Sequence, residues 1–350
     1  MSVEFQDVAK RYGTVTAVAG VSFKVETGTL VTLLGPSGCG KTTTLRMIAG
    51  LELPSEGRIS IAGRDVTTLG ASQRDVSMVF QSYALFPHMT VLDNVCYGLR
   101  RSGQSRDAAA RQARESLLQV GLKGFEERQP SELSGGQQQR VAVARALVLK
   151  PSVLLFDEPL SNLDARLRRQ MREEIRELQR KLGLTVVYVT HDQQEAMAVS
   201  DRIIVMNAGR IEQQGSPRDL YERPATPFLA RFMGESNPAR GRLRRIDPAT
   251  VRLRLGTCEL DVANTGAADG EATLAIRPEA IAVVGPADAD SNTLAGTIAK
   301  ASYLGTHMEY SIDTTAGMLF AVCPHVDRPL AAGDQVALRL APRGVLVVES

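Results

Sequence analysis

The segment Gly35-Pro-Ser-Gly-Cys-Gly-Lys41-Thr42 restricts the fold of this chain more than any other feature. It follows the strand-like run Leu30-Val-Thr-Leu-Leu34 and opens a helical pattern over Lys41 to Ala49, which Gly50 is expected to close. Its glycines allow main-chain N–H groups to wrap phosphate groups, and a helix N-terminus favours anions. A plain glycine-rich turn is the alternative, but the strand before it and the helix after it favour a phosphate loop.

Lys41 and Thr42 are the side chains of this loop that carry chemistry. In such loops the lysine neutralises the β- and γ-phosphates and the hydroxyl is a Mg²⁺ ligand, so we expect ATP and Mg²⁺ as the bound species. Because Cys39 lies beside Lys41 and a helix N-terminus, we expect a lowered thiol pKa and reactivity that ATP blocks; inert burial is the alternative. The residues expected to bind the nucleotide here are Gly35, Pro36, Ser37, Gly38, Cys39, Gly40, Lys41, Thr42 and Thr43.

A second element, Val153-Leu-Leu-Phe-Asp157-Glu158, places two carboxylates after a buried strand. Asp157 is expected to reach the Mg²⁺ shell, and Glu158 to polarise an attacking water. An acidic pair after a strand is by itself typical of a helix cap or turn. Together with the phosphate loop, it favours catalysis.

The third element is Leu133-Ser134-Gly135-Gly136-Gln137. Ser134 as N-cap with Gln137 three residues later predicts a capping box that opens a helix toward Pro151. Capping does not explain the paired glycines, which are costly at a helix start unless a group approaches the main chain closely. A terminal phosphate is such a group, so Ser134, Gly135, Gly136 and Gln137 are also expected to bind nucleotide.

The pattern of apolar and polar residues along the chain changes near residue 236. Residues 1–235 alternate apolar runs with amphipathic stretches and predict an α/β domain around a buried parallel sheet. One of its strands, Thr185-Val-Val-Tyr-Val-Thr190, ends at His191, which Asp192 and Glu195 follow. Residues 236–350 consist of short alternating runs divided by Gly, Asp and Pro, which predict a small all-β barrel or sandwich.

Composition excludes several other classes of protein. The formal net charge of +2 gives no basic excess for nucleic acid, and the four cysteines form no CxxC pair, which argues against a disulfide framework or a zinc site. The N-terminal residues lack a signal-peptide pattern, and no apolar run approaches the roughly 20 residues that span a bilayer. Any membrane role is therefore expected to come through a partner.

With these motifs in this order, the chain resembles the ATPase subunit of ABC importers of the maltose, polyamine and ferric-ion type, over essentially all 350 residues. The resemblance implies a P-loop NTPase domain over 1–235 with a helical subdomain at about 85–150, and an OB-like TOBE domain over 236–350. It also implies an adenine contact for Tyr12, a Mg²⁺ and water contact for Gln81, a γ-phosphate contact for His191, and a D-loop at Ser161 to Asp164. The expected catalytic set is then Lys41, Gln81, Glu158 and His191; the expected metal set is Thr42, Gln81 and Asp157.

The resemblance also implies partners. Two copies face head to tail, with each ATP between one phosphate loop and the other copy's Ser134–Gln137 segment, and transmembrane permease subunits bind the pair. A solute-binding protein takes part indirectly, and the chain lies peripherally on the cytoplasmic face of a bacterial inner membrane. The solute is left open: a polyamine or ferric ion is preferred over a phosphonate, sugar or sulfate. The alternative from another class is a non-transport ABC ATPase, which the lack of a second motif set and of inserted coiled coils disfavours.

Overall fold

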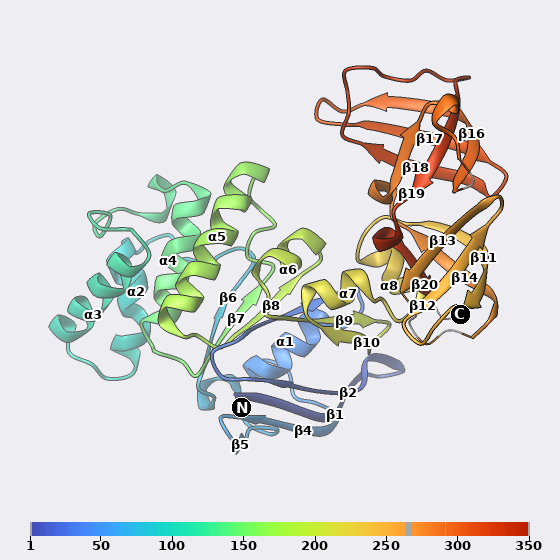
Figure 1. Ribbon diagram of the computed structural model, residues 1–350. Helices are drawn as coiled ribbons and strands as arrows, with labels where there is room; N and C mark the ends of the chain where they lie inside the picture. The colour runs from blue at the N-terminus through green and yellow to red at the C-terminus, as the bar shows by residue number, and fades with distance from the viewer. Residues whose placement is uncertain (1, 264–265, 267, 291, 349–350) are drawn as a thin grey trace. The chain divides into compact units, whose positions relative to one another are not determined.

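The computed structural model describes residues 2–263, 266, 268–290 and 292–348. The chain forms two compact units, Met1–Pro217 and Arg218–Ser350, whose elements are labelled in Figure 1. Both regions have the predicted classes of structure, α/β first and all-β later. The functional domain boundary expected at residue 235 stays a prediction.

The central sheet of the first unit has six strands in the order β10-β9-β3-β8-β7-β6, all parallel except β10. Val153 and Leu155 of β7 enter one hydrophobic core, and Leu154 and Phe156 enter another on the opposite face. Because the sheet is covered on both faces, its strands appear in the sequence as continuous apolar runs. The strands are β3 (Leu30–Leu34), β6 (Val76–Val79), β7 (Val153–Asp157), β8 (Val186–Thr190), β9 (Arg202–Asn207) and β10 (Arg210–Gly215).

A second, antiparallel sheet and helix α1 (Lys41–Ala49) share the core on one face of the central sheet. Phe5 and Phe23 stack in this core with ring centroids 4.5 Å apart. The order of this sheet is β2-β1-β4-β5. Its strands are β1 (Val3–Tyr12), β2 (Val15–Val25), β4 (Glu56–Ile61) and β5 (Arg64–Asp65).

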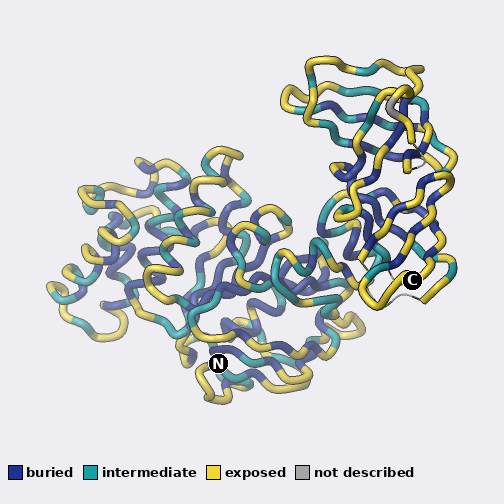
Figure 2. Tube along the Cα trace, in the orientation of Figure 1, coloured by how far each residue is buried: buried dark blue, intermediate teal, exposed yellow. Residues whose placement is uncertain are grey.

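Helices α4, α5 and α6 cover the other face of the central sheet, and α2 and α3 join α4 in a core of their own. Side-chain oxygens of Thr90, Ser105 and Asp164 accept hydrogen bonds from main-chain N–H groups at the starts of α2, α3 and α5, as N-cap residues do. Figure 2 shows the buried strands and helix faces beneath exposed helix surfaces. The elements are α2 (Val91–Arg101), α3 (Arg106–Gln119), α4 (Gly135–Leu147), α5 (Ala165–Leu182), α6 (Gln193–Val199), η1 (Ala71–Gln73) and η2 (Pro130–Glu132).

The second unit is built on two five-stranded antiparallel sheets that share one core. The short alternating runs of residues 236–350 form antiparallel strands, which confirms the prediction of an all-β region. One sheet has the order β13 (Cys258–Ala263), β12 (Thr250–Leu255), β11 (Asn237–Arg245), β14 (Gly270–Ile276), β20 (Val345–Val348). The other has the order β15 (Ile281–Val284), β19 (Gln335–Leu340), β16 (Thr293–Tyr303), β17 (Met308–Thr314), β18 (Gly317–Cys323). The helical elements are α7 (Pro217–Glu222), α8 (Pro227–Phe232), η3 (Pro278–Ala280), η4 (Pro286–Asp288) and η5 (Pro342–Gly344).

Arg277 joins α8 to the sheets of the second unit. Its Nη1 donates to the carbonyls of Ala230 and Gly234, each at 2.7 Å, and its guanidinium lies 4.2 Å from the ring centroid of Tyr221. The side chain is buried, and this burial lowers the pKa of Arg277. These contacts satisfy carbonyls at the end of α8 that have no partner within the helix.

Candidate functional site

The polar segments expected to carry function follow four parallel strands at the same edge of the central sheet. Residues 35–40 follow β3, Gln81 lies just beyond β6, Glu158 follows β7 and His191 follows β8. Because β8 lies between β3 and β7 in the sheet, segments distant in the sequence meet there. Carboxyl ends of parallel strands are where ligands bind in open α/β sheets.

The loop 35–40 is packed tightly against neighbouring main chain at two of its glycines. A Cβ added to Gly35 would lie 2.2 Å from the Met206 carbonyl oxygen, and one added to Gly40 would lie 2.5 Å from that of Ala17. No larger residue fits at either position. Gly40 has a left-handed conformation immediately before α1, and Gly50 closes the helix in the same conformation, as predicted.

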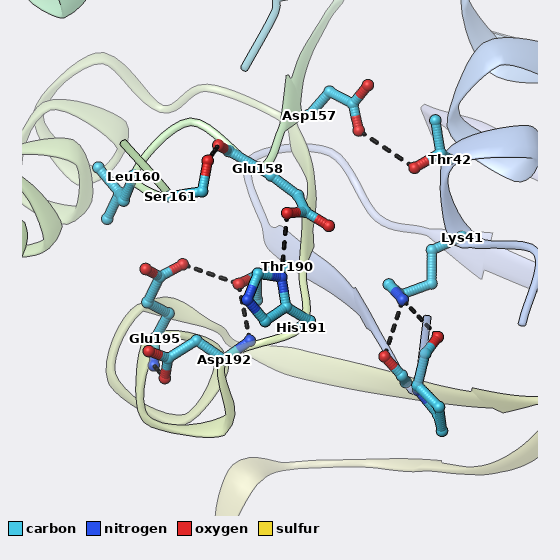
Figure 3. Close-up of polar contacts among 12 residues, drawn as sticks. Lys41, Thr42, Asp157, Glu158, Leu160, Ser161, Thr190, His191, Asp192 and Glu195 are labelled. Atoms are coloured by element: carbon cyan, nitrogen blue, oxygen red, sulfur yellow. Dashed lines mark hydrogen bonds and ion pairs between the residues drawn. The ribbon is translucent and has the colours of Figure 1, made fainter. Parts of the chain in front are cut away.

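Lys41 and the more exposed residues complete the loop. The Lys41 ammonium is buried and donates to the carbonyls of Gly35 at 2.7 Å and Pro36 at 2.8 Å (Figure 3). Ser37 and Gly38 are exposed, and Thr43 is half-buried in the first turn of α1. The loop therefore combines one held cation with main-chain groups open to a ligand.

The expectation for Cys39 is contradicted. Burial raises the pKa of its thiol, and the neighbouring Lys41, whose Nζ lies 3.8 Å from Sγ, lowers it by less. The side chain packs in the core beneath the loop. From the sequence we expected the nearby cation and helix start to lower the pKa of this thiol. The sequence did not show that the side chain is buried, and burial raises that pKa.

Thr42 and Asp157 bring two side-chain oxygen atoms close together. The Thr42 hydroxyl donates to Asp157 Oδ1 at 3.4 Å. Burial raises the pKa of the Asp157 carboxyl, while the Thr42 hydrogen bond acts in the opposite direction. A hydroxyl and a carboxylate at the mouth of a phosphate loop are a donor set that fits Mg²⁺.

Glu158 and His191 face each other across the ends of β7 and β8. His191 Nδ1 lies 3.0 Å from Glu158 Oε2 (Figure 3), and the Glu158 N–H donates to the Val189 carbonyl at 3.0 Å. Glu158 has a φ of 46°, a left-handed conformation that is uncommon for a residue with a side chain. Strand pairing thus holds a strained main chain that directs this carboxylate toward His191.

The turn after Glu158 connects the strand ends to one another. Ser161 Oγ donates to the Glu158 carbonyl at 3.0 Å, and Asn162 Nδ2 donates to the Gln81 carbonyl at 3.0 Å. Asp164 is the N-cap of α5. Asn162 lies in the segment expected to be the D-loop, but nothing in the local sequence shows that its amide reaches residue 81.

The segment Ser134–Gln137 forms the predicted capping box at the start of α4, with Ser134 Oγ accepting from the Gln137 N–H at 3.4 Å. Contacts within the chain also favour glycine at these two positions, which we did not predict. A Cβ on Gly136 would lie 3.1 Å from Leu167 Cδ1, and one on Gly135 would lie 3.3 Å from Leu163 Cδ2. Within the described part of the chain, no hydrogen bond joins this segment to the loop 35–40.

Tyr12 lies at the end of β1, where its side chain is 46% exposed and Lys10 Nζ lies 4.8 Å from its ring centroid. An exposed aromatic ring with one open face can stack on a flat heterocycle. Like the Ser134–Gln137 segment, Tyr12 is outside the cluster that the strand ends bring together.

Comparison with known proteins agrees with this architecture. Residues 18–161 match the ABC transporter family, and residues 274–348 match the TOBE domain. The chain is 57% identical to the Fe(3+) ions import ATP-binding protein FbpC 1 of Rhizobium meliloti, and 56% identical to FbpC of Brucella abortus. Each match covers 99% of this chain and 98% of the relative.

Solved structures of ATP-binding cassettes are also similar. The dimeric post-hydrolysis cassette MJ0796 bound to ADP and Pi is 33% identical, with a TM-score of 0.54, over 61% of this chain and 98% of that one. CbiO1 of Clostridium perfringens, part of the cbiONQ transporter complex, is 28% identical, with a TM-score of 0.59, over 62% of this chain and 89% of that one.

The fold and these matches define a class of protein. The chain belongs to the ABC transporter family and is its ATP-binding, ATP-hydrolysing subunit. The C-terminal TOBE domain and the full-length relatives make it an ATPase subunit of the importer type. None of the described helices is both long and apolar enough to cross a membrane.

Proposed function

We propose that this chain powers ferric-ion import, as the ATPase subunit of an ABC transporter in the inner membrane of a bacterium. The observation that supports ferric iron over a polyamine, phosphonate, sugar or sulfate is identity along the whole chain to relatives named for Fe(3+) import. Other subunits bind the solute, so the roles proposed for residues of this chain concern ATP hydrolysis. We take residues 1–235 as the ATPase domain and 236–350 as the TOBE-like domain that stabilises the pair.

In this proposal the loop 35–40 and Lys41 bind the ATP phosphates. The Lys41 ammonium already lies within reach of the loop carbonyls of Gly35 and Pro36 and would exchange them for phosphate oxygens. Thr42 and Asp157, 3.4 Å apart, would hold Mg²⁺ together with the Gln81 side chain. When bound, Mg²⁺ neutralises charge on the phosphates and polarises the terminal one.

Glu158 and His191 are proposed to act on the attacking water and the terminal phosphate. The Glu158 carboxylate accepts a proton from, and orients, the water, while the imidazole contacts the γ-phosphate. Their polar atoms lie 3.0 Å apart, which is close enough for the two side chains to act on the same bound water and phosphate. This juxtaposition is the geometric observation that supports hydrolysis at this edge of the sheet.

The remaining proposed contacts need a second copy of the chain. Tyr12 stacks on adenine in one copy. The terminal phosphate of that ATP is bound by residues of the other copy, which are Ser134, Gly135, Gly136 and Gln137. Asp164 lies at the interface between the two copies. The separation of the Ser134–Gln137 segment from the loop 35–40 within one chain supports this head-to-tail arrangement. ATP then joins the two copies, and its hydrolysis lets them separate.

The further partners follow from the same proposal. Permease subunits bind the ATPase pair at the cytoplasmic face of the inner membrane, and a solute-binding protein delivers the ion to them. Nucleic acid is not an expected partner, since the chain has a formal net charge of only +2.

Uptake by a strain lacking this gene tests the solute. The strain is complemented with wild type or Glu158→Gln and offered labelled ferric iron, spermidine, putrescine, a phosphonate and a maltodextrin. We expect loss of ferric-iron uptake alone, restored by wild type and not by Glu158→Gln. Loss of another solute would reassign the transporter. Unchanged uptake of all five in a strain without a paralogue would overturn ferric-ion import and leave a solute outside the panel, such as sulfate, or the non-transport alternative.

A further inference from the structure

Arg168, in the first turn of α5, contacts the segments that follow two different strands. Its Nη2 donates to the Leu163 carbonyl at 3.0 Å and its Nε to the Leu160 carbonyl at 3.4 Å, both in the turn after Glu158. The same guanidinium lies 3.7 Å from a carboxylate oxygen of Asp192 and 3.7 Å from one of Glu195, which both follow His191. One side chain therefore bridges the ends of β7 and β8.

The two carboxylates are themselves held in place. Glu195 is buried, and its Oε2 accepts hydrogen bonds from Thr190 Oγ1 at 2.8 Å and from the Tyr188 hydroxyl at 3.2 Å. Asp192 caps α6 by accepting from the Glu195 N–H at 3.0 Å, and its own N–H donates to Thr190 Oγ1 at 3.0 Å (Figure 3). Arg168 thus attaches the turn after Glu158 to a rigid support immediately beyond His191.

The contacts form a closed ring. The chain runs from Glu158 to Leu160, whose carbonyl accepts from Arg168. Arg168 also contacts Asp192, the chain returns to His191, and His191 Nδ1 lies 3.0 Å from Glu158 Oε2. The His191 side chain is 57% exposed, so few other contacts restrain it. Strand pairing brings the main chains of β7 and β8 together, but beyond the strand ends the two side chains are restrained by the Arg168 bridge and by one exposed hydrogen bond, which is a weak restraint.

We infer that Arg168 is a positioning residue for ATP hydrolysis, which keeps the Glu158 turn and His191 at the distance at which they act together. The inference rests on the proposed roles of Glu158 and His191. A displacement of about 1 Å between reacting groups can cost on the order of 100-fold in rate. The effect of losing Arg168 therefore falls on kcat, while ATP binding at the loop 35–40 is unchanged.

The test uses three variants of the full chain in the assembled transporter. Arg168→Met removes the charge and the hydrogen bonds, and Arg168→Lys keeps only the charge. The matched control is Arg169→Met, since among the described residues the neighbouring Arg169 pairs with Glu173 alone, at 3.5 Å, and 78% of its side chain is exposed. We expect kcat to fall about 10- to 100-fold in Arg168→Met, less in Arg168→Lys and not in Arg169→Met, with the KM for ATP within about 2-fold throughout.

A second readout reports the imidazole directly. The chain contains four histidines, so ¹³C-labelled histidine gives few signals, and His191→Gln assigns the one of interest. We expect the His191 signal to move in Arg168→Met and to stay in Arg169→Met. A residue that only stabilised the helix would lower the melting temperature and leave this signal in place.

The outcomes separate the inference from the proposed roles. If Glu158→Gln and His191→Ala are inactive while Arg168→Met has wild-type kcat and an unmoved His191 signal, the inference is wrong and the roles stand. If Glu158→Gln and His191→Ala both turn over ATP normally, both are wrong. Should Arg168→Met not fold, Arg168→Lys and Glu195→Gln are combined: effects on kcat that are less than additive support a shared path, and strictly additive effects overturn it.

Discussion

His191 Nδ1 and Glu158 Oε2 lie 3.0 Å apart although 33 residues separate them in the chain. The pairing of β7 with β8 brings their strand ends together, and the left-handed conformation of Glu158 turns its carboxylate toward the imidazole. A strained residue held by strand pairing is a means of fixing a reactive group before its substrate arrives.

Glu158→Gln is expected to bind ATP and to lower turnover by more than about 100-fold, because an amide cannot accept the proton of the attacking water. The closed dimer should then accumulate at saturating ATP and Mg²⁺. Light scattering on the isolated chain, where closure turns monomers into dimers, and phosphate release from the assembled transporter measure the two effects. A variant that stays open under these conditions would contradict the dimer mechanism.

Alkylation of Cys39 is expected to be slow near neutral pH. Burial raises the pKa of this thiol above its ordinary value, so the reactive thiolate is scarce at pH 7 and its share grows as the pH rises. Mass spectrometry after iodoacetamide treatment of a chain with the other three cysteines changed to serine measures the rate. ATP should protect, and a rate at pH 7 above that of free cysteine would show that desolvation does not dominate.

Asp157→Asn is expected to raise the melting temperature at pH 7 while abolishing ATP turnover. Burial raises the folded-state pKa above the usual 3.8, so the ionised carboxylate destabilises the native state at higher pH. As pH falls through the raised pKa, the wild-type carboxyl becomes protonated and the difference disappears. Thermal unfolding without nucleotide or metal at pH 7 and at decreasing pH measures this, with the exposed Asp313→Asn as a control that should show no such trend.

Gly136→Ala tests why the paired glycines are needed. Its Cβ would lie 3.1 Å from Leu167 Cδ1, so we expect overpacking that is partly offset by the better helix propensity of alanine, a net loss of about 1 kcal/mol measured by urea unfolding, and a loss of ATP turnover. Adding Leu167→Val should recover both, because it makes room within the same chain. Stability that recovers without turnover would show that the glycine serves the other copy's nucleotide.

Local sequence predicted much of the site. The helix from Lys41 to Gly50, the capping box of Ser134 and Gln137, and the acidic pair after a buried strand were all readable, because each depends on residues within a few positions of one another. The wrong expectation for Cys39 came from the same local reasoning, since neighbours in the chain do not show how deeply a side chain is buried.

By itself, then, the sequence determined the elements, their ends and the types of residue placed at the strand ends. Only the tertiary structure decided which of these meet. The strand order β3-β8-β7-β6 brings His191 to Glu158 and Asn162 to Gln81, and Arg168 crosses between two of the same segments. The physical reason is that hydrogen-bonded pairing between strands distant in the chain sets these distances, and no pattern of neighbouring residues encodes it.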